Sequence, residues 1–194
     1  MYNFNALLAR LKYIPRWSLM RQSRREDVAQ HTTEVIFVAH TLCLLANNMF
    51  GKNVSREKVC MCAAYHDVSE ILTGDMPTPV KYNNDAIQSA FKDIEKTAIE
   101  KLLQTARPQI QHDLSCRLTG SCLTDYEKKI LKAADKLCAL TKCIEELQSS
   151  NKEFSSAFDT INLSLKEMEM PEVDFFMENM LDGYRLCLDE LARI

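Results

Sequence analysis

Apolar residues recur along this chain with the spacing of amphipathic helices. Near the N-terminus they fall at positions 4, 7, 8 and 11, which is one face of a helix. No segment alternates apolar and polar residues as a half-buried strand does. The pattern therefore predicts an all-α protein, a compact bundle of about six to eight helices. The main helices are expected over residues 3–13, 27–50, 83–105, 108–118, 125–150, 153–168 and 172–193.

The stretch from residue 60 to residue 82 interrupts this regular pattern. It is expected to continue an apolar helix, which Gly74 ends before a loop with two prolines. His66 and Asp67 stand side by side in this helix, and Glu70 follows one turn later. Such ionisable groups are costly to bury unless they are paired or bind a metal. An imidazole nitrogen beside a carboxylate oxygen suits a divalent transition metal or magnesium.

Two further ionisable residues lie in apolar helical segments far from this stretch. His31 is in the first turns of the helix expected over residues 27–50, and Asp135 is in the middle of the helix over 125–150. Each has an ordinary explanation alone, as a capping histidine and as the partner of a nearby lysine. With the His-Asp pair they offer two nitrogens and two oxygens to one ion. A six-coordinate ion would then keep two positions open for water or substrate.

Composition narrows the possible functions. A length of 194 residues fits one domain, and we expect residues 1–194 to form a single domain. With 24 basic and 27 acidic residues the formal charge is -3, which gives no overall attraction to nucleic acid or membrane. No apolar run reaches the roughly 20 residues that span a bilayer, and no signal peptide opens the chain. We expect a cytoplasmic protein whose eight cysteines are free thiols.

The order of His, His-Asp and Asp on successive helices resembles the HD-domain metal-dependent phosphohydrolases. Longer runs narrow the resemblance to the bacterial 5′-deoxynucleotidases of the YfbR type. These runs are R-W-S-L-M-R, A-Y-H-D-V-S-E-I-L-T-G-D-M-P-T-P-V-K-Y, and K-A-A-D-K-L-C-A with the nearby C-I-E-E-L. The resemblance implies a homodimeric enzyme that hydrolyses deoxyribonucleoside 5′-monophosphates to deoxyribonucleosides and phosphate. It also implies selectivity against ribonucleotides and 3′-phosphates.

The resemblance implies roles for particular residues. One divalent cation, such as Co²⁺, Mn²⁺ or Mg²⁺, would be bound by His31, His66, Asp67 and Asp135. Arg16 would bind the phosphate, and Trp17 would lie against the deoxyribose and exclude a 2′-hydroxyl. The residues expected to contact substrate are Arg16, Trp17, His31, Asp67, Asp75, Met76, Pro77, Thr78 and Asp135. In one departure, the family's S-E-H-S is A-Q-H-T here, so Gln30 replaces an acid beside the first ligand.

Hydrolysis of a phosphate monoester needs positive charge, a positioned water and a proton for the leaving alkoxide. The planar guanidinium of Arg16 matches phosphate oxygens, so it is a catalytic candidate. Glu70 and Asp75 are the candidates for proton transfer. The sequence leaves open which of these two carboxyl groups acts as the acid and which as the base.

Two other functions remain open on the sequence. One is another HD phosphohydrolase, acting on triphosphates, cyclic nucleotides or (p)ppGpp. A two-metal phosphodiesterase would need more histidines between Asp67 and Asp135, where only His112 lies. The other is a non-catalytic nucleotide-sensing module, which would be expected to lack the three catalytic candidates. All three are present, which favours an enzyme.

Overall fold

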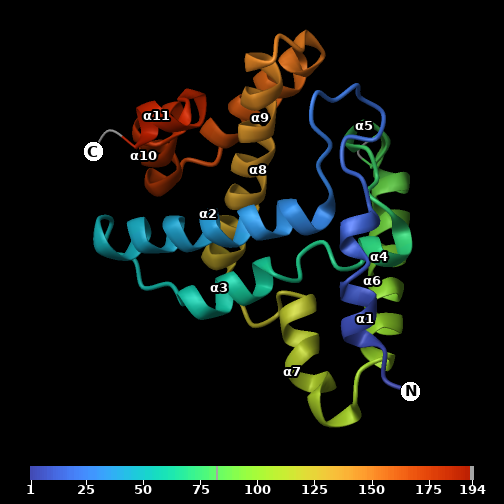
Figure 1. Ribbon diagram of the computed structural model, residues 1–194. Coiled ribbons are helices and arrows are strands. Elements are labelled where there is room, and N and C mark those ends of the chain that lie inside the picture. The colour runs from blue at the N-terminus through green and yellow to red at the C-terminus, as the bar shows by residue number, and fades with distance from the viewer. Residues whose placement is uncertain (82, 193–194) are drawn as a thin grey trace.

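The computed structural model describes residues 1–81 and 83–192 (Figure 1). This part of the chain contains helices and turns but no strand beyond an isolated bridge between Pro15 and Asp27. The all-α prediction is confirmed. The elements are α1 (Phe4–Leu8), η1 (Leu11–Tyr13), α2 (Val28–Asn48), α3 (Arg56–Ala63), α4 (Glu70–Thr73), α5 (Thr78–Lys81), α6 (Asp85–Gln104), α7 (Pro108–Leu118), α8 (Asp125–Gln148), η2 (Lys152–Phe154), α9 (Ser155–Lys166), α10 (Pro171–Asn179), η3 (Leu181–Arg185) and α11 (Leu188–Leu191).

The two helices that carry the distant site residues begin at strong capping residues. Asp27 caps α2, where its side chain accepts a hydrogen bond from the Gln30 backbone amide. Thr124 and Glu127 form a capping box at the start of α8. Both helices follow the predicted boundaries closely, because their caps and their apolar spacing agree.

Helix α2 lies at the centre of the fold. Figure 1 shows it running across the middle of the molecule, with α8 crossing it and α3 beneath it. Helix α9 lies beside α8, while α1 and α6 lie side by side at the opposite end from α10 and α11. The large hydrophobic cluster joins α2, α3, α8 and α10. A smaller cluster joins α1, α6 and α7 around Val68.

By length and composition α2 could cross a membrane. Its position argues for a different explanation, since it packs against α3, α8 and α10 and buries His31 completely. We therefore interpret α2 as the core helix of a globular fold. The prediction of free cysteines is confirmed, because all eight are unpaired in the structure.

Two terminal helices are shorter than predicted. The expected helix over residues 3–13 is divided, because α1 packs against α6 whereas η1 packs against α2. The expected helix over residues 172–193 is divided into α10, η3 and α11 across its described part, up to residue 192. Here α10 packs against α2 and η3 against α8. In both places the chain turns so that its apolar residues can reach two different partners.

Candidate active site

The His-Asp pair lies in a series of tight turns. Helix α3 ends at Ala63 and α4 begins at Glu70, so the prediction of a continuous helix through His66 is wrong. Backbone amides in this segment mostly bond to the carbonyl three residues before, as Glu70 does to Asp67. Cys62 and Ala63 pack in the large cluster, whereas Val68 packs in the small one. The tighter winding carries the chain from one cluster to the other and leaves the pair between them.

Three side chains, His31 of α2 with His66 and Asp67 of this turn segment, form a mutually close set, and Asp135 of α8 contacts it through His31. His31 Nε2 lies 3.0 Å from Asp135 Oδ1 and 3.7 Å from Asp67 Oδ2. His66 Nε2 lies 3.1 Å from the same Asp67 oxygen. Ligands at right angles around a small divalent ion lie about 3 Å apart when each bond is about 2.1 Å long. The separations therefore fit a shared ion.

The remaining nitrogens of the two histidines are oriented as in metal sites. His66 Nδ1 lies 2.8 Å from the Ala63 carbonyl oxygen, and His31 Nδ1 lies 3.5 Å from a carboxylate oxygen of Glu26. The hydrogen bond to Ala63 turns the other ring nitrogen of His66 toward the ion, whereas His31 Nδ1 is buried near Glu26 without a hydrogen bond. His66 Nε2 is also buried without a hydrogen bond, although Asp67 Oδ2 lies 3.1 Å away, so it is free to bind a cation. The residues present thus fit a divalent cation.

The predicted ligands are brought together and the excluded histidines are not. His31, His66 and Asp67 form a mutually close donor set among the described residues, and Asp135 joins it through His31. Asp135 contacts this histidine at 3.0 Å, where the sequence alone also allowed a lysine of its own helix. His40 and His112, which the sequence argument set aside, lie exposed on the surface.

Charges in the cluster reinforce one another. Although burial opposes it, the Asp67 carboxylate raises the pKa of His66 to about 9. Burial likewise opposes ionisation of Asp67, but the His66 and Arg16 charges hold the pKa of this carboxyl below its usual range. The hydrogen bond with His31 outweighs burial and lowers the pKa of Asp135. A dication would replace the proton that the raised pKa of His66 favours and would keep both carboxylates charged.

The carboxyl groups of Glu70 and Asp75 have raised pKa values, in contrast to the lowered pKa values of Asp67 and Asp135. Burial first, and then the negative charges of Asp67 and Asp75, raise the pKa of Glu70 to about 9. Its Oε2 atom is buried without a hydrogen bond. Burial also raises the pKa of Asp75, against the opposing effects of Arg16 and a hydrogen bond from the Trp17 backbone amide. Glu70 is therefore a protonated carboxyl at neutral pH beside the cluster, which suits proton transfer.

Arg16 connects the cluster to the loop that carries Trp17. Its Nη1 donates to Asp67 Oδ2 at 3.3 Å, and its Nε forms an ion pair with Glu26 Oε1 at 3.0 Å. The Arg16 side chain is 12% exposed and so is largely buried beside the cluster. A phosphate group bound next to the cluster would therefore contact the Arg16 guanidinium.

Trp17 is held in an uncommon conformation. Its φ of +57° is in the left-handed region, which a bulky side chain rarely adopts. Its ring packs against Phe154 with a centroid distance of 5.2 Å, and its Nε1 donates to Glu26 Oε2 at 3.2 Å. Backbone strain of this kind concentrates at functional sites, where surrounding contacts over-determine it.

Glu26 is the site residue that the sequence argument missed. It is buried and faces Arg16, Trp17 and His31 at once. The sequence signal was faint, because Glu26 is one acid next to the two arginines that precede it and just before the α2 cap. Gln30, which replaces the family's acid, lies in the first turn of α2 and lines a pocket on the far side of Glu26.

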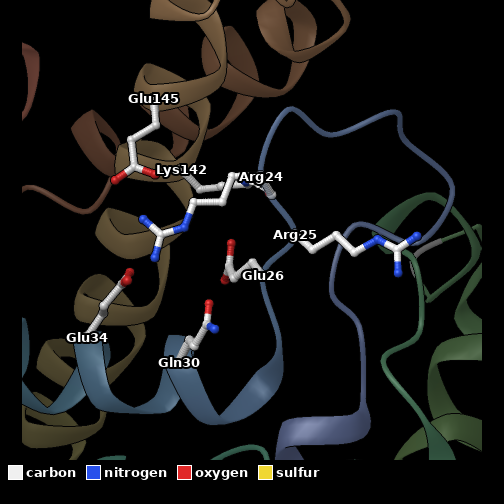
Figure 2. Close-up of a pocket in the computed structure, with 7 residues that line it drawn as sticks. All are labelled: Arg24, Arg25, Glu26, Gln30, Glu34, Lys142 and Glu145. Atoms are coloured by element: carbon white, nitrogen blue, oxygen red, sulfur yellow. Dashed lines mark hydrogen bonds between the residues drawn. The ribbon is translucent and has the colours of Figure 1, made fainter.

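That pocket lies between α2, α8 and the loop of residues 15–26 that carries Trp17, called here the Trp17 loop (Figure 2). In this view Arg24 extends toward Glu34 and Glu145, whereas Arg25 points away from the other side chains. The cavity measures about 20 Å³, which is room for about one water and too little for an organic ligand. The lining residues are Arg24, Arg25, Glu26, Gln30, Glu34, Lys142 and Glu145.

Helix α8 holds the Trp17 loop from its other side. Glu146 is fully buried and accepts hydrogen bonds from Lys142 Nζ at 2.6 Å and from the Ser23 backbone amide at 2.8 Å. Asn151 Nδ2 donates to Glu146 at 2.8 Å and to the Arg21 carbonyl at 2.7 Å. The C-I-E-E-L run of the sequence therefore has a structural role, which is to anchor this loop.

The remaining predicted substrate residues follow Gly74. Met76 and Pro77 are half-buried, and α5 begins at residue 78 inside what was predicted to be a loop. The Thr78 side chain lies outside the described part of the structure. These positions stay predictions for substrate contact.

Solved structures with the same arrangement of helices define the class. An HD-domain phosphohydrolase from Listeria innocua matches with a TM-score of 0.84 at 23% identity, over 94% of this chain and 88% of that one. The HD phosphohydrolase DatZ of cyanophage S-2L, bound to dA and one catalytic Zn²⁺ ion, matches with a TM-score of 0.63 at 17% identity. That match covers 92% of this chain and 96% of the phage chain. The chain has the HD-domain phosphohydrolase fold.

Sequence comparison is more specific. A family model described as 5′-deoxynucleotidase YfbR-like matches residues 3–184. A 5′-deoxynucleotidase of Yersinia pestis (strain Pestoides F) is 43% identical over 192 residues, which cover 99% of this chain and 98% of that protein. The chain therefore belongs to the YfbR-like 5′-deoxynucleotidase family of phosphohydrolases. The expected family, fold class and enzyme class are confirmed.

Proposed function

We propose that this 5′-deoxynucleotidase acts on deoxyribonucleoside 5′-monophosphates and rejects ribonucleotides and 3′-phosphates. The observation that carries the proposal is the meeting of two histidines and two carboxylates beside Arg16 and Trp17. A cation site, a buried guanidinium and a rigid aromatic ring are the three parts that this selectivity requires. The Yersinia pestis relative carries the same activity in its name.

We propose one divalent cation held by His31, His66, Asp67 and Asp135. When bound, such an ion lowers the pKa of a coordinated water and screens the phosphate charge. Co²⁺, Mn²⁺ and Mg²⁺ are candidates, since affinity follows ligand type while availability decides occupancy. The cyanophage structure, which holds one catalytic Zn²⁺ ion in the same fold, supports a single ion.

The chain's own residues then position the phosphate and move a proton. Arg16 exchanges part of its pairing with Asp67 for two phosphate oxygens, for which its planar fork is suited. Glu70 carries a proton at neutral pH because burial and Asp67 raise its pKa. We assign Glu70 Oε2 as the atom that passes this proton toward the reacting oxygens. Asp75 lies near Arg16 and is the second candidate for this step.

Trp17 sets the choice of sugar in this proposal. Its ring is fixed at one edge by Glu26 and packs against Phe154, so it cannot easily withdraw from an added hydroxyl. A clash of this kind rejects ribonucleotides without weakening the binding of deoxyribonucleotides. Met76 and Pro77 are proposed to complete the substrate loop.

The test is phosphate release by metal-free protein from dAMP, AMP, 3′-dAMP and dATP, with Co²⁺, Mn²⁺ or Mg²⁺ added back. Release from dAMP alone, dependent on metal and absent in Asp135→Ala, is the expected result. Release from dATP or AMP would keep the cation site but reject the proposed substrate. No release from any of them would favour a nucleotide-sensing role.

We also propose a single domain, a cytoplasmic location and a homodimer. Met180, Leu186 and Leu188 are exposed near the C-terminus and provide apolar surface for a second copy, while Phe176 is buried in the core. Light scattering after size-exclusion chromatography would give a mass near 44.6 kDa, twice the 22.3 kDa chain, if the dimer forms. A mass of one chain would reject it.

A further inference from the structure

One buried carboxylate contacts all three functional parts of the site. Glu26 Oε1 lies 3.0 Å from Arg16 Nε and 3.5 Å from His31 Nδ1. Glu26 Oε2 accepts a hydrogen bond from Trp17 Nε1 at 3.2 Å. The Glu26 side chain is 9% exposed. The groups assigned to phosphate, sugar and cation therefore share one acid.

A buried carboxylate is costly unless its oxygens are fully used. Glu26 divides its two oxygens between different partners, one facing Arg16 and His31 and the other facing Trp17. No single partner uses both oxygens, so the arrangement is not a simple ion pair with Arg16. It resembles a three-way junction, in which loss of the acid would release each partner separately.

The tryptophan end of this junction is under strain. Trp17 has a φ of +57°, and its carbonyl oxygen accepts a bond from Gln22 Nε2 at 3.3 Å. The ring contacts Phe154 on one face, but the indole N–H is fixed by Glu26. Without that acceptor the ring would keep its packing and lose the bond that sets its rotation.

The histidine end of the junction faces the cation site. His31 Nδ1 is buried without a hydrogen bond, and the Glu26 carboxylate, 3.5 Å away, is the negative group behind it that favours the ring orientation with Nε2 toward the ion. Gln30, the residue beside His31, has no charge with which to do this. Glu26 therefore provides the negative group behind His31 Nδ1.

We propose that Glu26 is a positioning residue that couples cation binding at His31 to sugar selection at Trp17. This inference rests on the proposed function of the site. Because one side chain orients both groups, its loss weakens the cation site and loosens the tryptophan together. A residue with a merely structural role would change stability without changing both readouts.

The experiment compares Glu26→Gln with the wild-type enzyme and with Glu34→Gln as a matched control. Glutamine keeps the size of the side chain and one acceptor oxygen but removes the charge. Glu34 lies on α2 and lines the same pocket, yet it makes none of the three contacts of Glu26. Trp17 is the single tryptophan of the chain, so intrinsic fluorescence reports on this loop alone.

Two measurements need no substrate. Acrylamide quenching of metal-free protein should rise about twofold in Glu26→Gln, with a red shift of the emission. Calorimetric titration with Co²⁺ should show affinity about 10- to 100-fold weaker, the usual cost of removing the partner of a ligating histidine. Glu34→Gln should match the wild type in both. The ratio of kcat/KM for dAMP to that for AMP should fall in Glu26→Gln alone.

Wild-type quenching or wild-type Co²⁺ affinity in Glu26→Gln would overturn the coupling. If the wild-type enzyme hydrolyses none of the nucleotides, the proposed function fails, but the fluorescence and calorimetry still decide this inference. Should Glu26→Gln fail to fold, Glu26→Asp retains the charge and shortens its reach. The same two shifts, smaller but parallel, are then expected, and no change in either would again reject the coupling.

Discussion

Two loops flank the candidate active site, and they are held in different ways. Residues 15–26 carry Arg16 and Trp17, and their ends are tied by backbone bonds such as Arg16 N to the Glu26 carbonyl at 3.0 Å. Buried side chains of α8 fasten the middle of this loop. Residues 74–77 include Asp75, Met76 and Pro77, which are predicted to contact substrate. The backbone hydrogen bonds of these residues are local, as between the Gly74 amide and the Glu70 carbonyl at 2.8 Å.

The two loops interact at Asp75. Burial raises the pKa of the Asp75 carboxyl, and the smaller, opposing effect of the Trp17 backbone amide lowers it. A loop fixed by buried charge can hold a rigid ring in a strained conformation, while a loop with local bonds can adjust to its ligand. Residues 15–26 are therefore the more firmly held of the two loops.

The largest expected effect is a loss of kcat, caused by a substitution that removes a proton-transfer group and leaves both loops intact. Glu70→Gln should lower kcat by about 100- to 10,000-fold, because the amide keeps the shape but cannot transfer a proton. The melting temperature should not fall, since the change removes a carboxyl from beside Asp67 and Asp75. Steady-state kinetics with dAMP checks this. A kcat within about tenfold of wild type would transfer the role to Asp75.

The second prediction compares how much the contacts of each loop contribute to the free energy of unfolding. Glu146→Ala should lower the free energy of unfolding by about 3–5 kcal/mol, because it leaves Lys142 buried without its partner. Met76→Ala in the other loop should cost about 1 kcal/mol or less, since Met76 is only half-buried. Urea unfolding of both variants makes the comparison. Equal losses would mean that the two loops are equally fastened.

The buried carboxylate of Glu146 also predicts that the stability of the protein depends on pH. Burial opposes ionisation of Glu146, but hydrogen bonds from Lys142, Asn151 and Ser23 lower its pKa to about 2. Because this value is below that of the unfolded chain, the stabilisation is complete above about pH 5 and is lost as the pH falls toward 2. It is of the order of 2–3 kcal/mol. The gap in unfolding free energy between wild type and Glu146→Gln should therefore narrow between pH 6 and pH 3, and a constant gap would contradict this.

The smallest effect concerns sugar choice. Trp17→Ala should raise kcat/KM for AMP relative to dAMP by about tenfold or more, because one steric exclusion is typically worth that much. Tyr13→Ala, which removes an exposed aromatic ring outside the loop, should leave the ratio unchanged. Continued refusal of AMP by Trp17→Ala would show that the ring does not select the sugar.

Local sequence patterns predicted most of the scaffold. Helices α2 and α8 could be located because apolar spacing and capping residues act within a few positions of each other. The four proposed ligands were found because their residue types are costly in apolar segments. The turn at residues 64–69 was missed, because the segment has helical spacing and only the division of the core into two clusters unwinds it.

By itself, the sequence determined the all-α class and the family, and it predicted the candidate site residues from Arg16 to Asp135. The tertiary structure alone decided how those residues are held. Glu146 contacts Ser23 across 123 positions, and Glu26 joins an arginine, a tryptophan and a histidine that share no periodic pattern. A buried carboxylate is stabilised by whichever donors the fold brings to it, and those donors leave no local signal in the chain.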